Sequence, residues 1–176
     1  MKVLQLLPIG NLEGGLLTEL GPALADAFHI PCEVMPHPLD AEIAFHGERQ
    51  QYHSSELLHH MQGYVREDCW RLLGITACDL YIPILTFVFG EAQIGGPCAL
   101  VSMHRLRQEF YGLPHDQDAL RERLLKESVH EIGHTLNLTH CEDYACAMAP
   151  SHAVEWIDLK ESSLCRSCRS RIFQEI

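Results

Sequence analysis

Apolar positions along the chain change their spacing from segment to segment, and these changes predict an alternation of strands and helices. Residues 3–7 form a short apolar run typical of a buried strand, and residues 16–28 carry apolar side chains at helical intervals. Residues 32–35 indicate a second strand. Residues 54–73 have the apolar stripe of an amphipathic helix, and we expect Gly74 to end this helix.

The following part of the chain predicts three more strands and then a long helix. The strands are expected at residues 75–82, 85–89 and 99–103, with glycine-rich turns between the last two. An amphipathic helix is expected over about residues 118–136. The order β-α-β-α-β-β-β followed by a helix predicts a fold of the α/β (α+β) class, in which a sheet packs on helices.

Length, charge and hydropathy restrict the possible classes of protein. A chain of 176 residues can fill one hydrophobic core, so we expect residues 1–176 to form a single domain. Its formal net charge of -11 opposes binding to nucleic acid or to anionic membrane surfaces, because both depend on Lys and Arg. No stretch approaches the roughly 20 apolar residues that span a bilayer. The first ten residues lack the features of an export signal, which predicts a cytoplasmic location.

The helix expected at residues 118–136 contains the strongest chemical signal of the sequence. His130 and His134 lie four residues apart, about one helical turn, so both imidazoles can bind one zinc ion. Glu131 is rotated by roughly 100° about the helix axis from His130, where it can act as a general base. Two protein ligands hold zinc weakly, and His140 is the expected third ligand. Without His140, two solvated histidines beside a surface glutamate would explain the pattern equally well.

Four of the eight cysteines are crowded near the end of the chain, in a spacing that indicates a second metal site. These four are Cys141, Cys146, Cys165 and Cys168. Four thiolates form a closed tetrahedral set, which is typical of structural zinc. Because Cys141 directly follows His140, this metal would also fix the turn that carries the third histidine. Disulfides or a redox pair are the alternatives, and His152 could replace one cysteine. We expect the other four cysteines to be buried free thiols.

The pattern HExxHxxNxxH at residues 130–140, followed by Met148, resembles the metzincin zinc peptidases. The cysteine spacing, CxxxxCxM at residues 141–148 and CxxC at residues 165–168, is similar to that of the archaemetzincins. Two positions depart from the family pattern. Asn137 stands where a glycine is usual, and the interval that follows Met148 is one residue shorter. Neither departure removes a ligand.

The resemblance implies a metzincin-like fold. Its mixed, twisted sheet would have an antiparallel edge strand and would pack on long helices, including the active-site helix. Residues 1–136 would hold the sheet and these helices, and residues 137–176 would form a small C-terminal subdomain with the cysteine zinc site. Met148 would lie beneath the zinc-binding histidines, whereas from its sequence position alone it could be an ordinary core methionine.

The resemblance also implies a function, namely hydrolysis of peptide bonds by a zinc metallopeptidase. The expected cofactors are two Zn²⁺ ions, one catalytic and one structural. Glu131 would activate the zinc-bound water, and a peptide or protein substrate would lie along an edge strand from residues 89–96. The main alternative is a zinc-stabilised peptide-binding protein with negligible turnover. A zinc-ribbon module is disfavoured, because it leaves the helix histidines unexplained.

Overall fold

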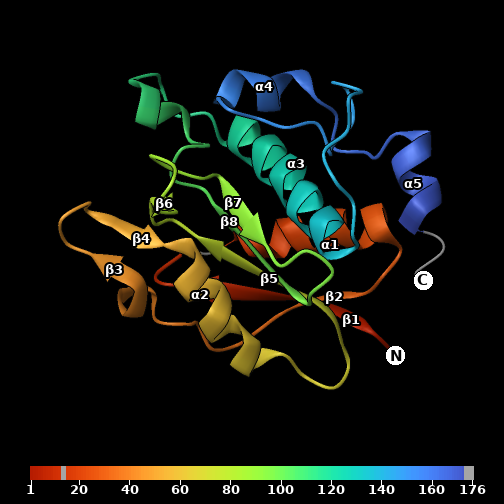
Figure 1. Ribbon diagram of the computed structural model, residues 1–176, viewed down its shortest axis with the longest axis horizontal. Helices are drawn as coiled ribbons and strands as arrows, with labels where there is room; N and C mark the ends of the chain where they lie inside the picture. The colour runs from red at the N-terminus through yellow and green to blue at the C-terminus, as the bar shows by residue number, and fades with distance from the viewer. Residues whose placement is uncertain (13–14, 173–176) are drawn as a thin grey trace.

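A five-stranded mixed sheet forms the centre of the protein (Figure 1). The structure is a computed structural model that describes residues 1–12 and 15–172. In spatial order the strands are β2 (Cys32–Val34), β1 (Val3–Ile9), β5 (Cys69–Thr76), β8 (Cys98–Ser102) and β7 (Gly90–Ala92). The first four are parallel, and β7 pairs antiparallel with β8 at one edge. The expected mixed sheet with an antiparallel edge strand is confirmed.

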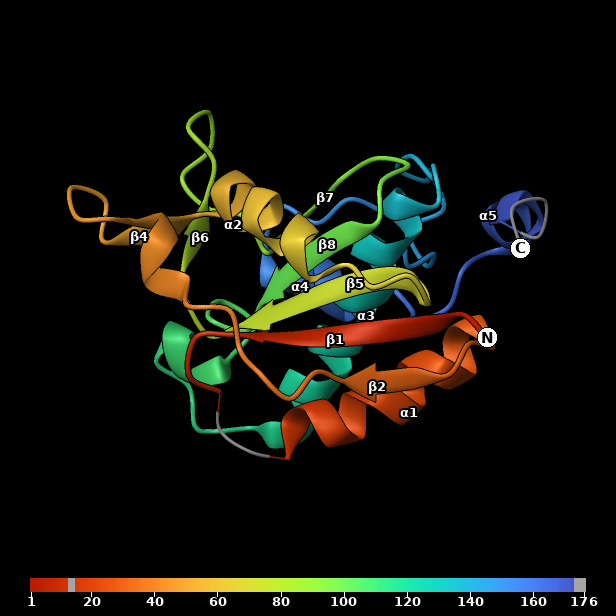
Figure 2. The ribbon, with the colours of Figure 1, turned by 90° about the horizontal axis from the view of Figure 1, so that it is seen from below.

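Helices cover both faces of this sheet (Figure 2). α1 (Leu16–Phe28) and α3 (Gln117–Thr135) pack on one face, and α2 (Ser54–Met61) packs on the other. The remaining elements are a small sheet of β3 (Phe45–His46), β4 (Gln51–His53) and β6 (Leu80–Tyr81), helices α4 (Val154–Leu159) and α5 (Arg166–Ile172), and the 3-10 helices η1 (Ala41–Ala44), η2 (Gln62–Tyr64) and η3 (Gln108–Tyr111). Within the described residues, no helix combines the length and the apolar character needed to cross a membrane.

Strand β5 shows how the sheet is buried on both faces. Leu73 and Ile75 point into the apolar cluster with α1 and α3, whereas Leu72 points into the cluster with α2. All three side chains are fully buried. Because successive side chains alternate between the faces of a strand, a strand covered on both faces is apolar at almost every position. The neighbouring strands β8 and β7 then lie against α3, so the edge strand and the long helix face each other.

The helix expected over residues 54–73 is wrong in its second half. α2 ends at Met61, and the chain enters β5 at Cys69. A strand that is buried on both faces lacks the alternation of polar and apolar residues, so its apolar run also satisfies helical spacing. Gly74, which we expected to end the helix, lies within β5 instead.

The strands expected at residues 75–82 and 85–89 also differ from the structure. The first range contains the end of β5, a turn and the short strand β6. Residues 85–89 form no strand. Val88 makes an isolated antiparallel bridge to Leu80 of β6, and side-chain donors satisfy other backbone groups, as where Arg49 Nη2 donates to the carbonyl oxygen of Leu85 at 2.9 Å. The other expected elements lie within one or two residues of their observed bounds.

Substitution of Gly74 tests the packing between the sheet and α2. A Cβ atom at this position would lie 2.5 Å from Ile9 Cδ1 and 3.0 Å from Met61 Sδ. We expect Gly74→Ala to lower the free energy of unfolding by about 1–3 kcal/mol, because the added methyl overpacks a filled core. Chemical denaturation measures this. Gly63→Ala is the control, because its Cβ would meet nothing within 4 Å, and equal stabilities of the two variants would contradict the prediction.

Candidate metal centre

Two histidines near the end of α3 are oriented with one nitrogen of each ring toward a common point. The Nε2 atoms of His130 and His134 lie 3.1 Å apart. Each ring places Nδ1 2.8 Å from a backbone carbonyl oxygen, that of Ala147 for His130 and that of Leu138 for His134. A carbonyl oxygen only accepts, so Nδ1 carries the proton in both rings and Nε2 keeps its lone pair. The two rings therefore have the tautomer and orientation of metal ligands.

The end of α3 delivers the third histidine. Asn137 has a left-handed backbone conformation, with φ of 61°, and its amide donates to the His134 carbonyl at 3.1 Å. The amide of Leu138 donates to the Gly133 carbonyl at 3.0 Å, which completes a Schellman motif. Asn tolerates this conformation better than other residues with a side chain, so it can replace the usual glycine. The reversal brings the ring of His140 to 5.1 Å from that of His134.

The three histidines predicted from the sequence thus meet at one place. One ligand nitrogen from each of His130, His134 and His140 lies within 4.8 Å of the others. Zinc binds imidazole nitrogen at about 2.0–2.1 Å, and the 3.1 Å between two of these nitrogens fits one shared ion. His130 is buried and His140 is exposed, so the group extends from the interior to the surface. Burial lowers the pKa of all three rings, which favours the neutral form that binds metal.

Glu131 lies in α3 with its carboxylate against the edge strand. Its residue is 6% exposed, and a Cβ atom on Gly90 of β7 would lie 2.9 Å from Glu131 Oε1. Only a glycine at this position leaves room for the carboxylate. Burial raises the pKa of Glu131 well above its usual value, and the negative charge of Glu127 raises it further. A carboxylate with a raised pKa binds a proton more readily, as a general base must.

The three histidines and Glu131 line a hollow of about 570 Å³, which lies between the edge strand β7 and the chain after Met148. Its lining includes, besides the four site residues, Gly90, Glu91, Ala92 and Ile94 on one side and Pro150, Ser151 and His152 on the other. The segment at residues 90–96, expected to lie along the cleft, lines it as far as Ile94, and the preceding residues 85–89 line it as well.

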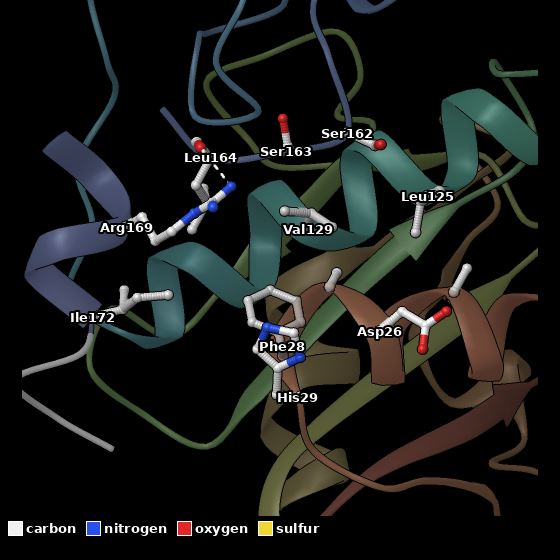
Figure 3. Close-up of a pocket in the computed structure, with 12 residues that line it drawn as sticks. Asp26, Phe28, His29, Leu125, Val129, Ser162, Ser163, Leu164, Arg169 and Ile172 are labelled. Carbon is white, nitrogen blue, oxygen red and sulfur yellow. Dashed lines mark hydrogen bonds between the residues drawn. The ribbon is translucent and has the colours of Figure 1, made fainter. Parts of the chain in front are cut away.

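A second hollow, of about 410 Å³, lies between α1, α3 and α5 (Figure 3). Its walls include Phe28 and His29 at the end of α1 and Arg169 of α5, as the close-up shows. None of the residues predicted as metal ligands or as the general base lines it. The three histidines and Glu131 line the first hollow instead.

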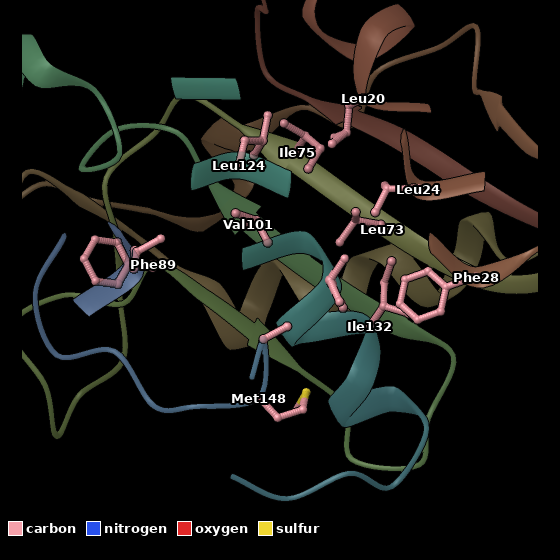
Figure 4. Close-up of a cluster of buried hydrophobic side chains, with 14 of the residues drawn as sticks. Leu20, Leu24, Phe28, Leu73, Ile75, Phe89, Val101, Leu124, Ile132 and Met148 are labelled. Atoms are coloured by element: carbon pink, nitrogen blue, oxygen red, sulfur yellow. The ribbon is translucent and has the colours of Figure 1, made fainter. Parts of the chain in front are cut away.

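Met148 packs under the active-site helix, as the sequence pattern implied. Its side chain is fully buried in the apolar cluster, and Figure 4 shows it beside the ribbon of α3. Gly133, between the two helix histidines, has no room for a Cβ atom because Met148 Sδ occupies that space. The carbonyl oxygen of Met148 accepts from the amide of Cys141 at 3.0 Å. The methionine thus fills the space beside Gly133, between the two helix histidines, and is hydrogen-bonded to the chain beside His140.

The four clustered cysteines also come together. One sulfur from each of Cys141, Cys146, Cys165 and Cys168 lies within 4.8 Å of the others, and all eight cysteines of the chain are free thiols. Two of these sulfurs lie 3.8 Å apart, close to the separation in a tetrahedral site with zinc–sulfur bonds of about 2.3 Å. The amide of Cys168 donates to Cys165 Sγ and lowers the pKa of that thiol. The donor set fits a closed metal site rather than a disulfide.

The sequence matches the family described as Peptidase family M54 over residues 23–174. The chain belongs to this family. The archaemetzincin of Methanocaldococcus jannaschii is 40% identical over 166 residues, which cover 94% of this chain and 89% of the relative. The solved archaemetzincin of Archaeoglobus fulgidus, complexed with malonate, is 34% identical with a TM-score of 0.82, covering 97% of this chain and 99% of that one. A zinc-dependent peptidase from Methanocorpusculum labreanum is 28% identical with a TM-score of 0.88, covering 96% and 99%.

Sequence reasoning missed one buried ion pair in this member of the peptidase family. Lys160 Nζ lies 2.8 Å from Glu127 Oε1, and neither side chain is accessible to solvent beyond 4%. Glu127 precedes Glu131 by four residues, so helical spacing could have placed it on the same face of α3. The sequence contains no comparable signal for Lys160, which follows α4 in an irregular part of the chain.

The cysteine cluster can be tested by replacing Cys165 and Cys168 together with serine. We expect this variant to lose one of two zinc ions per chain and to unfold at a lower temperature, because structural metal binding is coupled to folding. Metal analysis and thermal unfolding measure both effects. Cys32→Ser serves as the control, since Cys32 lies outside both ligand groups. An unchanged zinc content in the double variant would contradict a metal site at these cysteines.

Proposed function

We propose that this member of the peptidase family is a zinc-dependent metallopeptidase that hydrolyses peptide bonds in its first hollow. The observation that supports this most directly is the convergence of three imidazole nitrogens beside a buried carboxylate and an open cleft. Three histidines with an open fourth position are characteristic of catalytic rather than structural zinc. Membership of the peptidase family supports the same reaction class.

His130, His134 and His140 would hold the catalytic zinc ion. Bound there, zinc supplies Lewis-acid polarisation of the scissile carbonyl and lowers the pKa of water to about 7. Glu131 accepts a proton from the attacking water and then delivers it to the leaving amine. The water attacks directly, so no side chain of the protein forms a covalent bond with the substrate. Cys141, Cys146, Cys165 and Cys168 would hold a second, structural zinc ion.

The edge strand would bind the substrate backbone. In the described residues β7 pairs with β8 on one side, and its other side borders the hollow. An extended peptide can add to such an edge through main-chain hydrogen bonds. Gly90 and Ala92 carry no bulky side chains, so a substrate can approach the strand closely. The substrate class that follows is a peptide or an extended segment of a protein.

Replacement of Glu131 by glutamine tests the proposed reaction. We expect hydrolysis of a mixed peptide library to fall by about 10²–10⁴-fold, because this is the usual contribution of a general base. Zinc content should stay unchanged, since the three histidines remain. Glu155→Gln, an exposed change on α4, is the control.

Two results would contradict the proposal in different ways. Hydrolysis that survives Glu131→Gln would exclude Glu131 as the general base. A wild-type protein that holds zinc at the histidines and binds peptides, but does not hydrolyse them, would favour the peptide-binding alternative.

A further inference from the structure

The ion pair between Lys160 and Glu127 lies beside the metal centre and is shielded from water. Lys160 Nζ is 2.8 Å from Glu127 Oε1, and the Lys160 side chain has no exposed surface. Lysine is among the residues least often buried, and a buried charge requires close partners. The pair therefore needs an explanation beyond surface solubility.

Lys160 has a second partner that connects it to the chain under the histidines. Its Nζ donates to the carbonyl oxygen of Ala149 at 3.2 Å. Ala149 directly follows Met148, and the carbonyl oxygen of Ala147 accepts from His130 Nδ1 at 2.8 Å. Lys160 thus holds the segment at residues 147–149 from one end, while His130 is oriented by a carbonyl of the same segment.

Glu127 connects the same ammonium to the active-site helix. It lies one turn before Glu131 in α3 and borders the same hollow as the histidines. Through Lys160, this turn of α3 is bonded to the segment at residues 147–149. The lysine also compensates a carboxylate that would otherwise lie unpaired one turn from the general base.

We propose that Lys160 and Glu127 are positioning residues for the catalytic centre, a role that rests on the proposed zinc peptidase function. The pair fixes residues 147–149 against α3. That segment sets the orientation of the His130 ring through the Ala147 carbonyl, and it leads into the cleft wall at residues 150–152. Lys160 does not line the hollow, and both residues act on the centre through the segment that they hold.

A second ion pair, between α3 and the end of α4, provides a matched control. Arg123 of α3 and Asp158 of α4 form a bidentate pair, with both N–O distances 2.7 Å, and Arg123 is 5% exposed. This pair also fastens α4 to α3. It lies one turn further from Glu131 than Glu127 does, and Arg123 bonds to Leu106 rather than to residues 147–149.

The experiment compares Lys160→Met with Arg123→Met at a temperature where both variants are folded. Both substitutions should lower the unfolding temperature. Only Lys160→Met should weaken zinc binding at the histidines, by about 10–100-fold, as is usual when groups that orient a metal ligand are removed. Competition with a chelator measures the zinc affinity. The His140→Ala variant should lose the zinc ion of the histidine site, which shows which of the measured affinities belongs to that site. Lys160→Met should also lower kcat with little change in KM.

The double variant Glu127→Gln with Lys160→Met separates positioning from stability. It leaves no unpaired buried charge, so it should recover much of the lost stability and should fold even where Lys160→Met alone does not. Zinc binding at the histidines should stay weak, because the bond to Ala149 is still missing. Zinc affinity equal to that of wild type and of Arg123→Met would overturn the proposal. Zinc affinity is measured without substrate. If the wild type proved inactive, the peptidase function would be contradicted, but the comparison of zinc affinities would still test the positioning role of Lys160.

Discussion

Two imidazoles one helical turn apart need a third ligand to hold a metal firmly. The chain can supply His140 only if it turns back at the end of α3, so the whole three-histidine group depends on that reversal. Asn137 makes it in a left-handed conformation, and the hydrogen bonds of the Schellman motif hold it. The amide of Gly95, in the turn between β7 and β8, donates to the His134 carbonyl at 3.2 Å. A Cβ atom on Gly95 would lie 2.5 Å from Asn137 Oδ1. The helix end, the edge strand and the third histidine are therefore parts of one packed arrangement.

The cysteine cluster extends this dependence toward the C-terminus. Cys141 follows His140 directly, and its amide donates to the carbonyl oxygen of Met148. A metal held by the four thiolates would fix the chain on both sides of the methionine, because Cys146 lies two residues before it. Met148 Sδ occupies the space beside Gly133, so a shift of the segment around Met148 would displace the part of α3 between His130 and His134. A metal bound to the four thiolates would therefore limit the movement of the three histidines.

The ligand groups could be predicted from the sequence, because their geometry depends on short-range spacing. The period of a helix places His130 and His134 on one face, and the reversal before His140 involves few residues. The start of β5 could not be predicted in the same way. A parallel strand covered on both faces has no polar alternation, so Leu72 and Leu73 match a helix as well as a strand.

Contacts between distant residues account for the rest of what the sequence did not show. Lys160 and Glu127 are 33 residues apart and meet only through the packing of the chain after α4 against α3, and no local pattern marks Lys160 as buried. The wall of the hollow at residues 85–89 is another case. Arg49 reaches its backbone from the turn between β3 and β4, and Arg105 stacks on Phe87 with 4.2 Å from its guanidinium carbon to the ring centroid. These side chains and one isolated bridge, between Val88 and Leu80, hold the segment where the apolar pattern predicted a full strand.

The charges around the hollow connect metal binding to the state of the general base. Glu91 is held by the hydroxyl groups of Ser54 and Ser55 in the first turn of α2, and Glu127 is paired with Lys160. Glu131 has no comparable partner among the described side chains, and burial raises its pKa. A raised pKa means that the protonated form persists to higher pH than for an exposed carboxyl group. A divalent cation at the neighbouring histidines acts in the opposite direction, because it favours the ionised carboxylate. In the proposed mechanism, Glu131 would therefore be ionised, and able to act as a base, when the three histidines hold the metal.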